Sequence, residues 1–334
     1  MKKRYWILLI FLICITITYF VGPSSPNPLY GNTLPQLPNN FEELQENIAR
    51  KEDSMPVRRD NEARIIFQQE PPQITEYSIV YLHGFSGSYR DGYPVNMQLA
   101  DSLGANLYLA RWAGHGLKPP AAMKTFSAEA AWNSAREALA IGKKIGKKVI
   151  ILSTSTGGTL AIKLAAEFPE SVFAIINMSP NLKDDQMGAF MLNTRWGYEI
   201  ANLVTMGEKK IEYEEPQAAQ YFDTIYPAEA LVNLQVLVGS TMVPETFRKV
   251  TCPVLTLYYH ENFWKEDEHV EIEIYSEVHK KFSTPDSLVK LQPLATPGTH
   301  FLGSAIRSND TQVVLREILD FLQNKLEIPL RKKK

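Results

Sequence analysis

The stretch KVIILSTSTGGTLAIKLAAEF, residues 148–168, joins a strand pattern directly to a helical pattern. Its first part, 149–152, is continuously apolar, as a strand buried on both faces of a sheet must be. Its second part, 156–168, carries apolar residues at helical spacing. Ser155 stands between the two parts, with small residues on either side. The stretch therefore predicts a buried strand that turns sharply into a helix, with a serine at the turn.

Similar strand patterns recur along the chain and alternate with helical patterns. The predicted strands are 63–67, 78–84, 106–112, 148–155, 172–180, 253–259 and 288–294. This alternation predicts an α/β fold with a mostly parallel central sheet and helices on both faces. Residues 181–250 carry no clear strand and are too many for an ordinary crossover. We interpret them as an inserted helical cap over the carboxyl ends of the strands, where such sheets bind ligands.

The composition is typical of a folded globular protein, with 45% hydrophobic and 22% charged residues among 334. Seven of the 35 lysines and arginines lie at the two tips, which leaves 28 cations against 37 acidic residues in the body. Such a body lacks the clustered cations that phosphate contacts require, so nucleic-acid binding is excluded. Cys14 and Cys252 have no second Cys or His at ligand spacing. The sequence therefore predicts no disulfide framework and no zinc site.

The N-terminus combines three cations with an uncharged apolar run. Lys2, Lys3 and Arg4 precede YWILLIFLICITITYFV, residues 5–21, which as a helix just reaches the length of a membrane span. The preceding cations predict a cytoplasmic N-terminus and a body outside the cytoplasm. A cleaved signal peptide, which gives a secreted or periplasmic protein, is the alternative, but residues 20–23 (FVGP) offer no clean cleavage site. The sequence thus favours a single-pass membrane anchor.

A proline-rich segment follows the apolar run. Residues 22–40 contain five prolines and predict an extended, semi-rigid spacer that holds the body away from the bilayer. Asn40 is the expected N-cap of a helix over 41–53 that packs on the body. The expected division of the chain is an anchor or signal at 1–21, a linker at 22–40, the first part of the core at 41–180, a cap at 181–250, the second part of the core at 251–328, and a basic tail at 329–334.

Ser155 is the candidate nucleophile because it stands at a sharp strand-to-helix turn with a glycine two positions later. Small neighbours are needed there, since the backbone doubles back on itself. Ser153 stands where the usual motif has its first glycine, which keeps the small size. Ser153 is a poorer nucleophile candidate, because Ser155 and not glycine follows it by two. A serine-rich helix start with ordinary capping is the structural alternative.

An activated serine needs a base and donors for an oxyanion. His300 is the candidate base, because it follows the last predicted strand in a loop with glycine and proline. His83 ends the strand 78–84 and marks an oxyanion loop, with the amides of Phe85 and Thr156 as the expected donors. Of the other histidines, His115 lies in a glycine-flanked turn and is expected to be structural. His260 ends a strand, and we expect surface positions for His269 and His279.

The third member of such a site is an acid that orients the imidazole, and it is expected after the strand 253–259. Asp267 is the candidate, because a short carboxylate just before the next helical pattern can reach inward. Glu261 and Glu266 remain alternatives. A metal site built from His260, Glu261 and His269 fits no recognised ligand spacing. The sequence predicts no metal and no cofactor.

Several motifs occur together in order: SIVYLHGF, ARWAGHGL, ILSTSTGGTLA, DEHV at 267–270 and GTH at 298–300. With them the sequence resembles the α/β-hydrolase superfamily, in particular its monoacylglycerol-lipase-like and serine-aminopeptidase-like branch, over about residues 60–325. The resemblance implies an α/β-hydrolase fold in which 181–250 is the cap. The sequence departs from the pattern at Ser153, at Leu117-Lys118 after the Gly-His-Gly turn, and in a longer acidic loop before Asp267.

These residues predict a membrane-tethered serine hydrolase that cleaves carboxylic esters of small acyl or lipid-like substrates. Peptidase, amidase and thioesterase activities use the same machinery and stay open, as does a non-catalytic binding module on the same fold. A serine at the turn argues against reactions that need an aspartate nucleophile. The cap is expected to supply an apolar acyl-binding wall from Met187, Phe190, Met191, Leu192, Trp196 and Tyr198.

Overall fold

A central sheet of eight strands forms the body in the computed structural model, which describes residues 2–185 and 188–331. The strands run in the order β1-β3-β2-β4-β5-β8-β10, and β9 pairs with β8. Pairing is parallel from β3 to β10, whereas β1 and β9 are antiparallel to their neighbours. The strand bounds are β1 Arg64–Ile66, β2 Thr75–Leu82, β3 Asn106–Leu109, β4 Gly146–Thr154, β5 Ala174–Met178, β8 Val254–Asn262, β9 Lys265–Glu266 and β10 Val289–Leu294.

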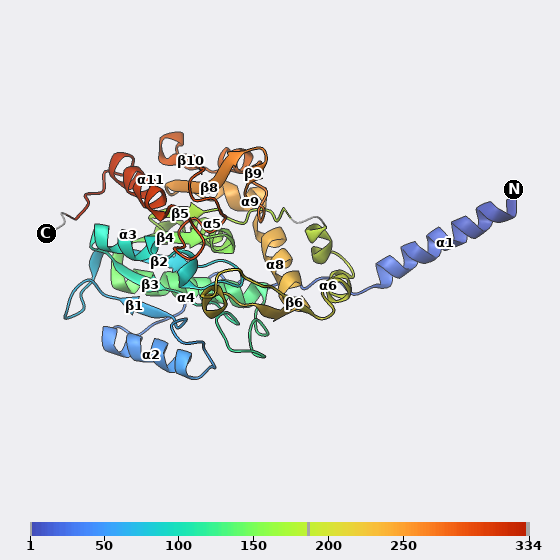
Figure 1. Ribbon diagram of the computed structural model, residues 1–334, viewed down its shortest axis with the longest axis horizontal. Coiled ribbons are helices and arrows are strands. Elements are labelled where there is room, and N and C mark those ends of the chain that lie inside the picture. Colours follow the sequence, from blue (N-terminus) through green and yellow to red (C-terminus); the bar gives the residue numbers. More distant parts are fainter. Residues whose placement is uncertain (1, 186–187, 332–334) are drawn as a thin grey trace.

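All seven strands that the sequence predicts are present, with shifted ends, and the predicted α/β class is confirmed. Helices cover both faces of the sheet (Figure 1). One face carries α3 and α11, and the other carries α4 and α5. The bounds of the body helices are α2 Phe41–Asp53, α3 Val95–Leu103, α4 Ala128–Ile145, α5 Thr156–Glu167, α10 Ile274–His279 and α11 Thr311–Asn324, with short 3-10 helices at Tyr89–Asp91, Pro169–Ser171 and Asp286–Leu288.

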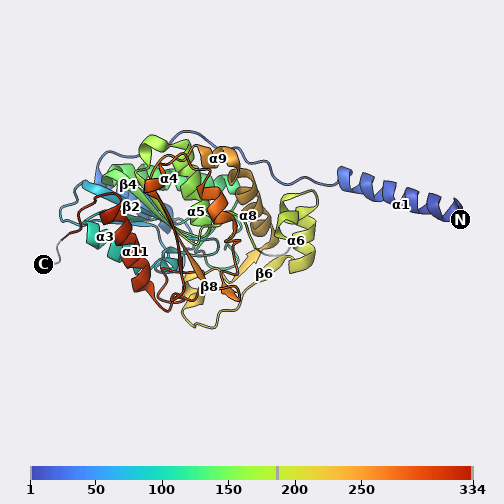
Figure 2. The ribbon, with the colours of Figure 1, turned by 90° about the horizontal axis from the view of Figure 1, so that it is seen from above.

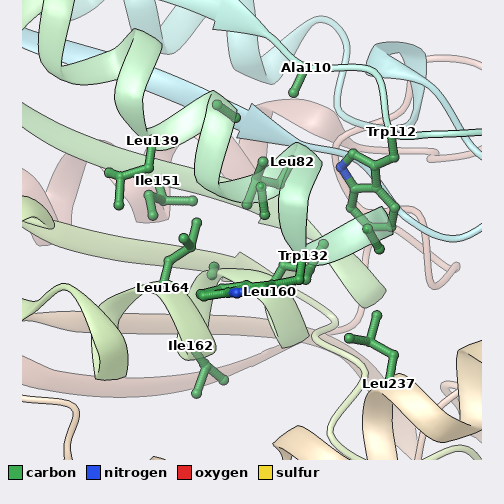
Figure 3. Close-up of a cluster of buried hydrophobic side chains, with 14 of the residues drawn as sticks. Leu82, Ala110, Trp112, Trp132, Leu139, Ile151, Leu160, Ile162, Leu164 and Leu237 are labelled. Carbon is green, nitrogen blue, oxygen red and sulfur yellow. The ribbon is translucent and has the colours of Figure 1, made fainter. Parts of the chain in front are cut away.

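The larger core lies between the sheet and the layer of α4 and α5 (Figure 3). Leu82 of β2 and Ile151 of β4 meet Leu139 of α4 and Leu160 of α5, and all four side chains are fully buried. Burying each such side chain contributes about 1.5–3 kcal/mol relative to leaving it in water. This packing holds the joint between β4 and α5 in a rigid frame.

The segment between β5 and β8 forms a group of mostly short elements beside the sheet, in which α8 and α9 also pack against α5. Their bounds are η3 Ala189–Asn193, α6 Gly197–Thr205, β6 Glu208–Lys210, α7 Ala218–Tyr221, β7 Ile225–Pro227, α8 Ala228–Thr241 and α9 Pro244–Arg248. The expectation of a strand-free segment is wrong, because β6 and β7 pair as an antiparallel ribbon. The sequence Glu-Lys-Lys of β6 is exposed and has no apolar run, so no strand pattern could reveal it.

The N-terminal helix α1, Lys2–Val21, projects away from the body in both views (Figures 1 and 2). Its window Arg4–Val21 has a mean hydropathy of 2.0, and none of it is buried against the body. The helix is long and apolar enough to cross a membrane. A signal sequence has the same properties.

Residues 22–40 are extended, as predicted, but they lie along the body and do not hold it away. Trp132 Nε1 of α4 donates to the carbonyl of Gly31 at 2.7 Å. The Tyr30 hydroxyl lies 2.7 Å from Ser240 Oγ of α8, and its ring packs edge-on against Trp132. Prolines leave the carbonyls of such a segment without internal partners, so they accept from side chains of the body. We call residues 22–40 the strap.

The C-terminal end of the strap and the C-terminal part of the chain are both bonded to the body. Asn40 Oδ1 accepts from the Glu43 amide at 2.6 Å, which confirms the predicted N-cap of α2. Leu44 and Ile48 of that helix are buried on the body. In the predicted basic tail 329–334, the Arg331 amide donates to the Ser102 carbonyl at 2.7 Å. Residues 332–334 lie outside the described residues.

Candidate active site

Ser155 lies between the end of β4 and the start of α5 in a strained backbone conformation, with φ 54° and ψ −121°. A non-glycine residue with positive φ persists only where its surroundings hold it. Here the Ser155 amide donates to Met178 O of β5 at 3.0 Å, and its carbonyl accepts from the amides of Gly158 and Asn181 at 2.8 and 2.9 Å. The neighbouring strand therefore fixes the turn that presents the serine.

Glycine is required just after this turn. A Cβ on Gly157 would lie 2.0 Å from the carbonyl oxygen of Leu82, so no other residue fits without moving β2. Ser153 faces the opposite way: it is fully buried, and its hydroxyl donates to Asn177 Oδ1 at 2.8 Å. Of the two serines, Ser155 is the one that lines the pocket described below.

His300 and Asp267 form a buried pair. His300 Nδ1 lies 2.7 Å from Asp267 Oδ2 and 2.9 Å from Oδ1, and the two side chains are 3% and 0% exposed. A proton on Nδ1 makes this hydrogen bond and leaves Nε2 of the neutral ring as an acceptor. His300 lines the same pocket as Ser155.

Burial by itself would raise the pKa of Asp267. The charge and hydrogen bond of His300, the His269 amide at 3.0 Å and the Ser179 hydroxyl outweigh burial, so the pKa lies below its ordinary value. The carboxylate therefore stays ionised at neutral pH. The alternative acids lie with other partners, since Glu266 is 3.4 Å from His260 Nδ1 and Glu261 pairs with Lys265 at 3.2 Å.

The expected oxyanion donors lie on two loops of the same pocket. Phe85 and Thr156 both line it beside Ser155. Thr156 is the first residue of α5, where amide groups have no partner within the helix and the helix dipole favours negative charge. His83 is buried under Phe85's loop, where its Nδ1 donates to Gly84 O at 2.8 Å while Nε2 accepts from the Trp112 amide at 3.3 Å. Burial lowers the pKa of His83 to about 4, so this ring is a neutral clamp.

Asp91, a buried carboxylate that no sequence motif marks, also holds the loop that carries Phe85. Asp91 Oδ2 accepts from the Gly84 amide at 2.6 Å, and Oδ1 accepts from the Tyr81 hydroxyl, which lies 2.8 Å from Thr154 Oγ1. Asp91 thus joins the loop before Phe85 to the strand that ends at Ser155. The sequence does not predict this role for Asp91, because the residue lies in a short 3-10 helix that carries no recognisable motif.

Asp91 predicts a pH dependence of stability. Burial raises the pKa of Asp91 to about 7 from 3.8, so the folded state binds this proton more tightly than the unfolded state. The contribution of Asp91 to the free energy of unfolding therefore falls as pH rises from about 4 to about 7, by at most about 1.4 kcal/mol per pH unit. When wild type and Asp91→Asn are unfolded by denaturant in the same detergent, the free energy of unfolding of the variant should depend less on pH between about 4 and about 7. Equal slopes for wild type and variant would contradict the assignment.

The pocket has a volume of about 410 Å³ and joins Ser155 to the cap. Its apolar wall includes Leu192, Ile200, Val204, Leu231 and Leu234. Polar groups also line it, including Asn181, Asp184 and Gln235, of which Gln235 donates to Asp184 at 2.8 Å. The arrangement offers a mostly apolar pocket that opens on Ser155 and carries a few polar groups, and we call it the apolar slot.

The predicted acyl wall is right only in part. Met191 and Leu192 line the pocket, whereas Phe190, Trp196 and Tyr198 are not among its described lining residues. Met187 lies outside the described residues. The sequence placed apolar residues in the cap but not the side on which each one lies, because the cap elements are too short for a periodic pattern.

His269 is a second feature that the sequence missed. It is exposed, as expected, but it opens to the pocket, and its ring centroid lies 4.8 Å from that of His300. Desolvation by the surrounding protein and the nearby His300 lower its pKa to about 4. His279 is half-buried and lies 3.0 Å from Thr256 Oγ1. Throughout residues 2–185 and 188–331, no three His, Cys, Asp or Glu side chains come together so as to hold a metal ion.

Solved structures of similar fold include lipases. One of the metagenome-derived lipolytic enzymes LipS and LipT is 19% identical, covers 80% of this chain and 99% of its own, and has a TM-score of 0.64. The monoacylglycerol lipase of Paleococcus ferrophilus is 15% identical, with 79% and 98% coverage and a TM-score of 0.58. A soluble variant of monoglyceride lipase from Saccharomyces cerevisiae is 12% identical, with 81% and 92% coverage and a TM-score of 0.55. These likenesses show the fold.

Among curated protein sequences, none shows significant similarity to this chain. The model of the alpha/beta hydrolase family matches residues 79–301, about two thirds of the sequence. The match spans the loop of Phe85, the turn at Ser155, the segment between β5 and β8, and the loop of His300. It agrees with the resemblance to the α/β-hydrolase superfamily. The chain belongs to the α/β-hydrolase family.

Proposed function

We propose that this protein is a serine hydrolase that cleaves carboxylic esters of acyl or lipid-like substrates. The observation that carries the proposal is the buried Asp267–His300 pair beside a serine held at a strained strand-to-helix turn. This constellation serves acyl transfer. The apolar slot next to Ser155 favours an acyl chain over a peptide as the bound group.

In the proposed mechanism, Ser155 Oγ attacks the ester carbonyl while its proton passes to His300 Nε2. Asp267 orients the ring and stabilises the imidazolium. The amides of Phe85 and Thr156 hold the negative charge on the carbonyl oxygen. His300 returns the proton to the departing alcohol, and water, activated by the same ring, then hydrolyses the acyl-enzyme. No cofactor takes part in this scheme.

The proposal is tested with a fluorophosphonate probe and a series of esters of graded chain length. Labelling at Ser155 together with ester turnover supports it. Labelling with turnover of amides or thioesters in place of esters would favour the amidase, peptidase or thioesterase alternatives. Absence of both labelling and turnover in folded protein would favour a binding module.

The slot predicts the chain-length preference. Ala201 of α6 is 2% exposed and lines the pocket, so Ala201→Phe should fill the slot and reduce kcat/KM for long-chain esters on the order of tenfold. Short esters should be cleaved at the wild-type rate. Asn202→Phe, at the next and exposed position of α6, is the matched control and should leave the profile unchanged. A loss that is equal for all chain lengths would contradict the slot.

We also propose that α1 is retained and anchors the body on the outer face of the cytoplasmic membrane. The exposed apolar helix and the cations before it support this orientation. Fractionation should recover the full-length chain with membranes, resistant to high salt and released by detergent. A soluble chain whose N-terminus begins near Gly22 would establish cleavage and a secreted or periplasmic protein instead.

A further inference from the structure

The cap carries a group of exposed apolar side chains close to the end of α1. Leu203, Val204 and Met206, on α6 and at its end, are 81%, 76% and 94% exposed, and Phe190 of η3 is 73% exposed. With Tyr198 we call these residues the cap patch. Single exposed apolar residues are common, but several of them on α6 and on η3, which packs against it, point to a binding surface.

The strap ties this cap directly to the anchor. Arg195 donates to the Gly22 carbonyl at 2.7 Å, and the Trp196 amide donates to the Pro23 carbonyl at 3.0 Å. Gly22 immediately follows the last residue of α1, and Trp196 immediately precedes α6. In both views α1 leaves the body beside α6 (Figures 1 and 2). No free residues of the strap therefore separate the end of α1 from its first hydrogen bonds to the cap.

The Trp196 side chain packs tightly against the backbone of Gly22. A Cβ at Gly22 would lie 2.0 Å from Trp196 Nε1, so the indole occupies the space beside this glycine. Ser25 Oγ adds a bond of 2.8 Å to the Thr194 carbonyl. Where a spanning helix ends, the chain enters the headgroup layer. A cap bonded to the first two residues after the helix must lie at that layer.

The pocket reaches the same surface. Val204 of the cap patch also lines the pocket. Two residues outside the patch, Met191 of η3 and Lys209 of β6, line the pocket as well. Lys209 and Lys210 are exposed next to the apolar residues, which suits anionic headgroups. Apolar residues flanked by cations are the chemistry of a surface that lies in a membrane interface.

We propose that the cap patch contacts the lipid bilayer, that the strap holds it there, and that the pocket receives its substrate from the lipid phase. The substrate class is therefore an ester with an acyl chain long enough to partition into a bilayer. The inference rests on the proposed retention of α1 and, for the substrate, on the proposed ester hydrolysis. The experiments below separate these parts.

The first experiment locates the patch in full-length protein reconstituted into vesicles of phosphatidylethanolamine and phosphatidylglycerol. In a Cys14→Ser, Cys252→Ser background, a polarity-sensitive fluorophore is attached at Leu203→Cys or, as the matched control, at Ile74→Cys. Ile74 is also exposed and apolar but precedes β2, at the opposite end of the sheet from the site. A headgroup nitroxide lipid should quench the probe at 203 and leave that at 74 unquenched. Equal quenching of the probes at 203 and 74 overturns the proposal. The proposal is also overturned if the probe at 203 reports an apolar environment but is not quenched by nitroxide lipid, because a second copy of the protein would then cover the patch.

The second experiment tests the strap. Inserting about twelve Gly and Ser residues between Val21 and Gly22 keeps the anchor but lets the body move away from the membrane. Quenching of the probe at 203 should fall at least twofold. Unchanged quenching would overturn the part of the proposal that assigns the holding role to the short connection.

The third experiment tests the source of the substrate. The variant Phe190→Ser, Leu203→Ser, Met206→Ser changes patch residues that are not among the described lining residues of the pocket. Its turnover of a long-chain monoester embedded in vesicles should fall about tenfold or more, whereas turnover of a short soluble ester should not change. An unchanged rate on vesicles, or an equal loss on both esters, overturns the proposal. If wild type cleaves neither ester, the proposed activity fails, and the fluorescence result still decides where the cap patch lies.

Discussion

Replacing Ser155 by alanine should abolish labelling by a fluorophosphonate probe and reduce turnover of a soluble ester by about 10³-fold or more. The hydroxyl is the group that attacks the carbonyl, and removal of a triad member costs this order of magnitude because the remaining members cannot act alone. The strained turn at Ser155 is kept by bonds from its backbone, which alanine leaves in place. The loss should therefore occur without a change in thermal stability of more than a few degrees.

Ser153→Ala is the matched control for that experiment. Its hydroxyl is buried against Asn177 and does not line the pocket, so labelling should remain largely intact. Some stability should be lost, on the order of 1 kcal/mol, because the Asn177 side chain loses a partner. If the fluorophosphonate probe labels Ser155→Ala fully, Ser155 is not the nucleophile and the proposed mechanism is wrong, whatever the result for Ser153→Ala.

The Asp267→Asn variant should also lose most of its activity, by about 10³–10⁴-fold in kcat. The change keeps the size of the side chain but removes the negative charge that stabilises the His300 imidazolium, and the amide can hold the ring in the wrong tautomer. Binding of substrate uses the pocket and not this carboxylate, so KM should change much less than kcat.

Glu266→Gln and Glu261→Gln serve as the controls for Asp267. These side chains pair with His260 and Lys265, and both of their partners are partly exposed, so each variant should keep activity within a few-fold of wild type. If either Glu variant is the inactive one and Asp267→Asn is active, the acid is misassigned although the serine hydrolase proposal stands.

Local sequence patterns were sufficient to predict seven of the eight strands of the sheet, all but the two-residue β9. The strands β4, β5 and β8 are continuous apolar runs because both faces of each strand are covered by helices, and this pattern is legible without any knowledge of partners. The turn at Ser155 could also be predicted from a local pattern. A strand that runs straight into a helix needs small residues. At Gly157 the physical cause is that a Cβ would lie only 2.0 Å from the carbonyl oxygen of Leu82.

The sequence names Asp267 as the candidate acid but leaves Glu261 and Glu266 open, because a local pattern does not show which carboxylate turns inward. Glu261, Glu266, Asp267 and Glu268 share one loop, and only the path of the β8–β9 hairpin decides which carboxylate turns toward His300. Asp91 and His269 were missed for the same reason. Each acquires its place near the site from a contact between elements distant in sequence, and no local pattern records such a contact.

The sequence by itself determined the class of fold, the position of the serine turn and the apolar N-terminal helix, because each depends on a local run or spacing. The tertiary structure alone decided that Asp267 pairs with His300, that Met191 and Leu192 rather than Phe190 line the pocket, and that the strap lies on the body. These outcomes depend on which surfaces meet when the chain folds. Proline content predicts an extended strap, but its carbonyls dock on α4 and the cap because donors on those elements happen to lie within hydrogen-bond distance.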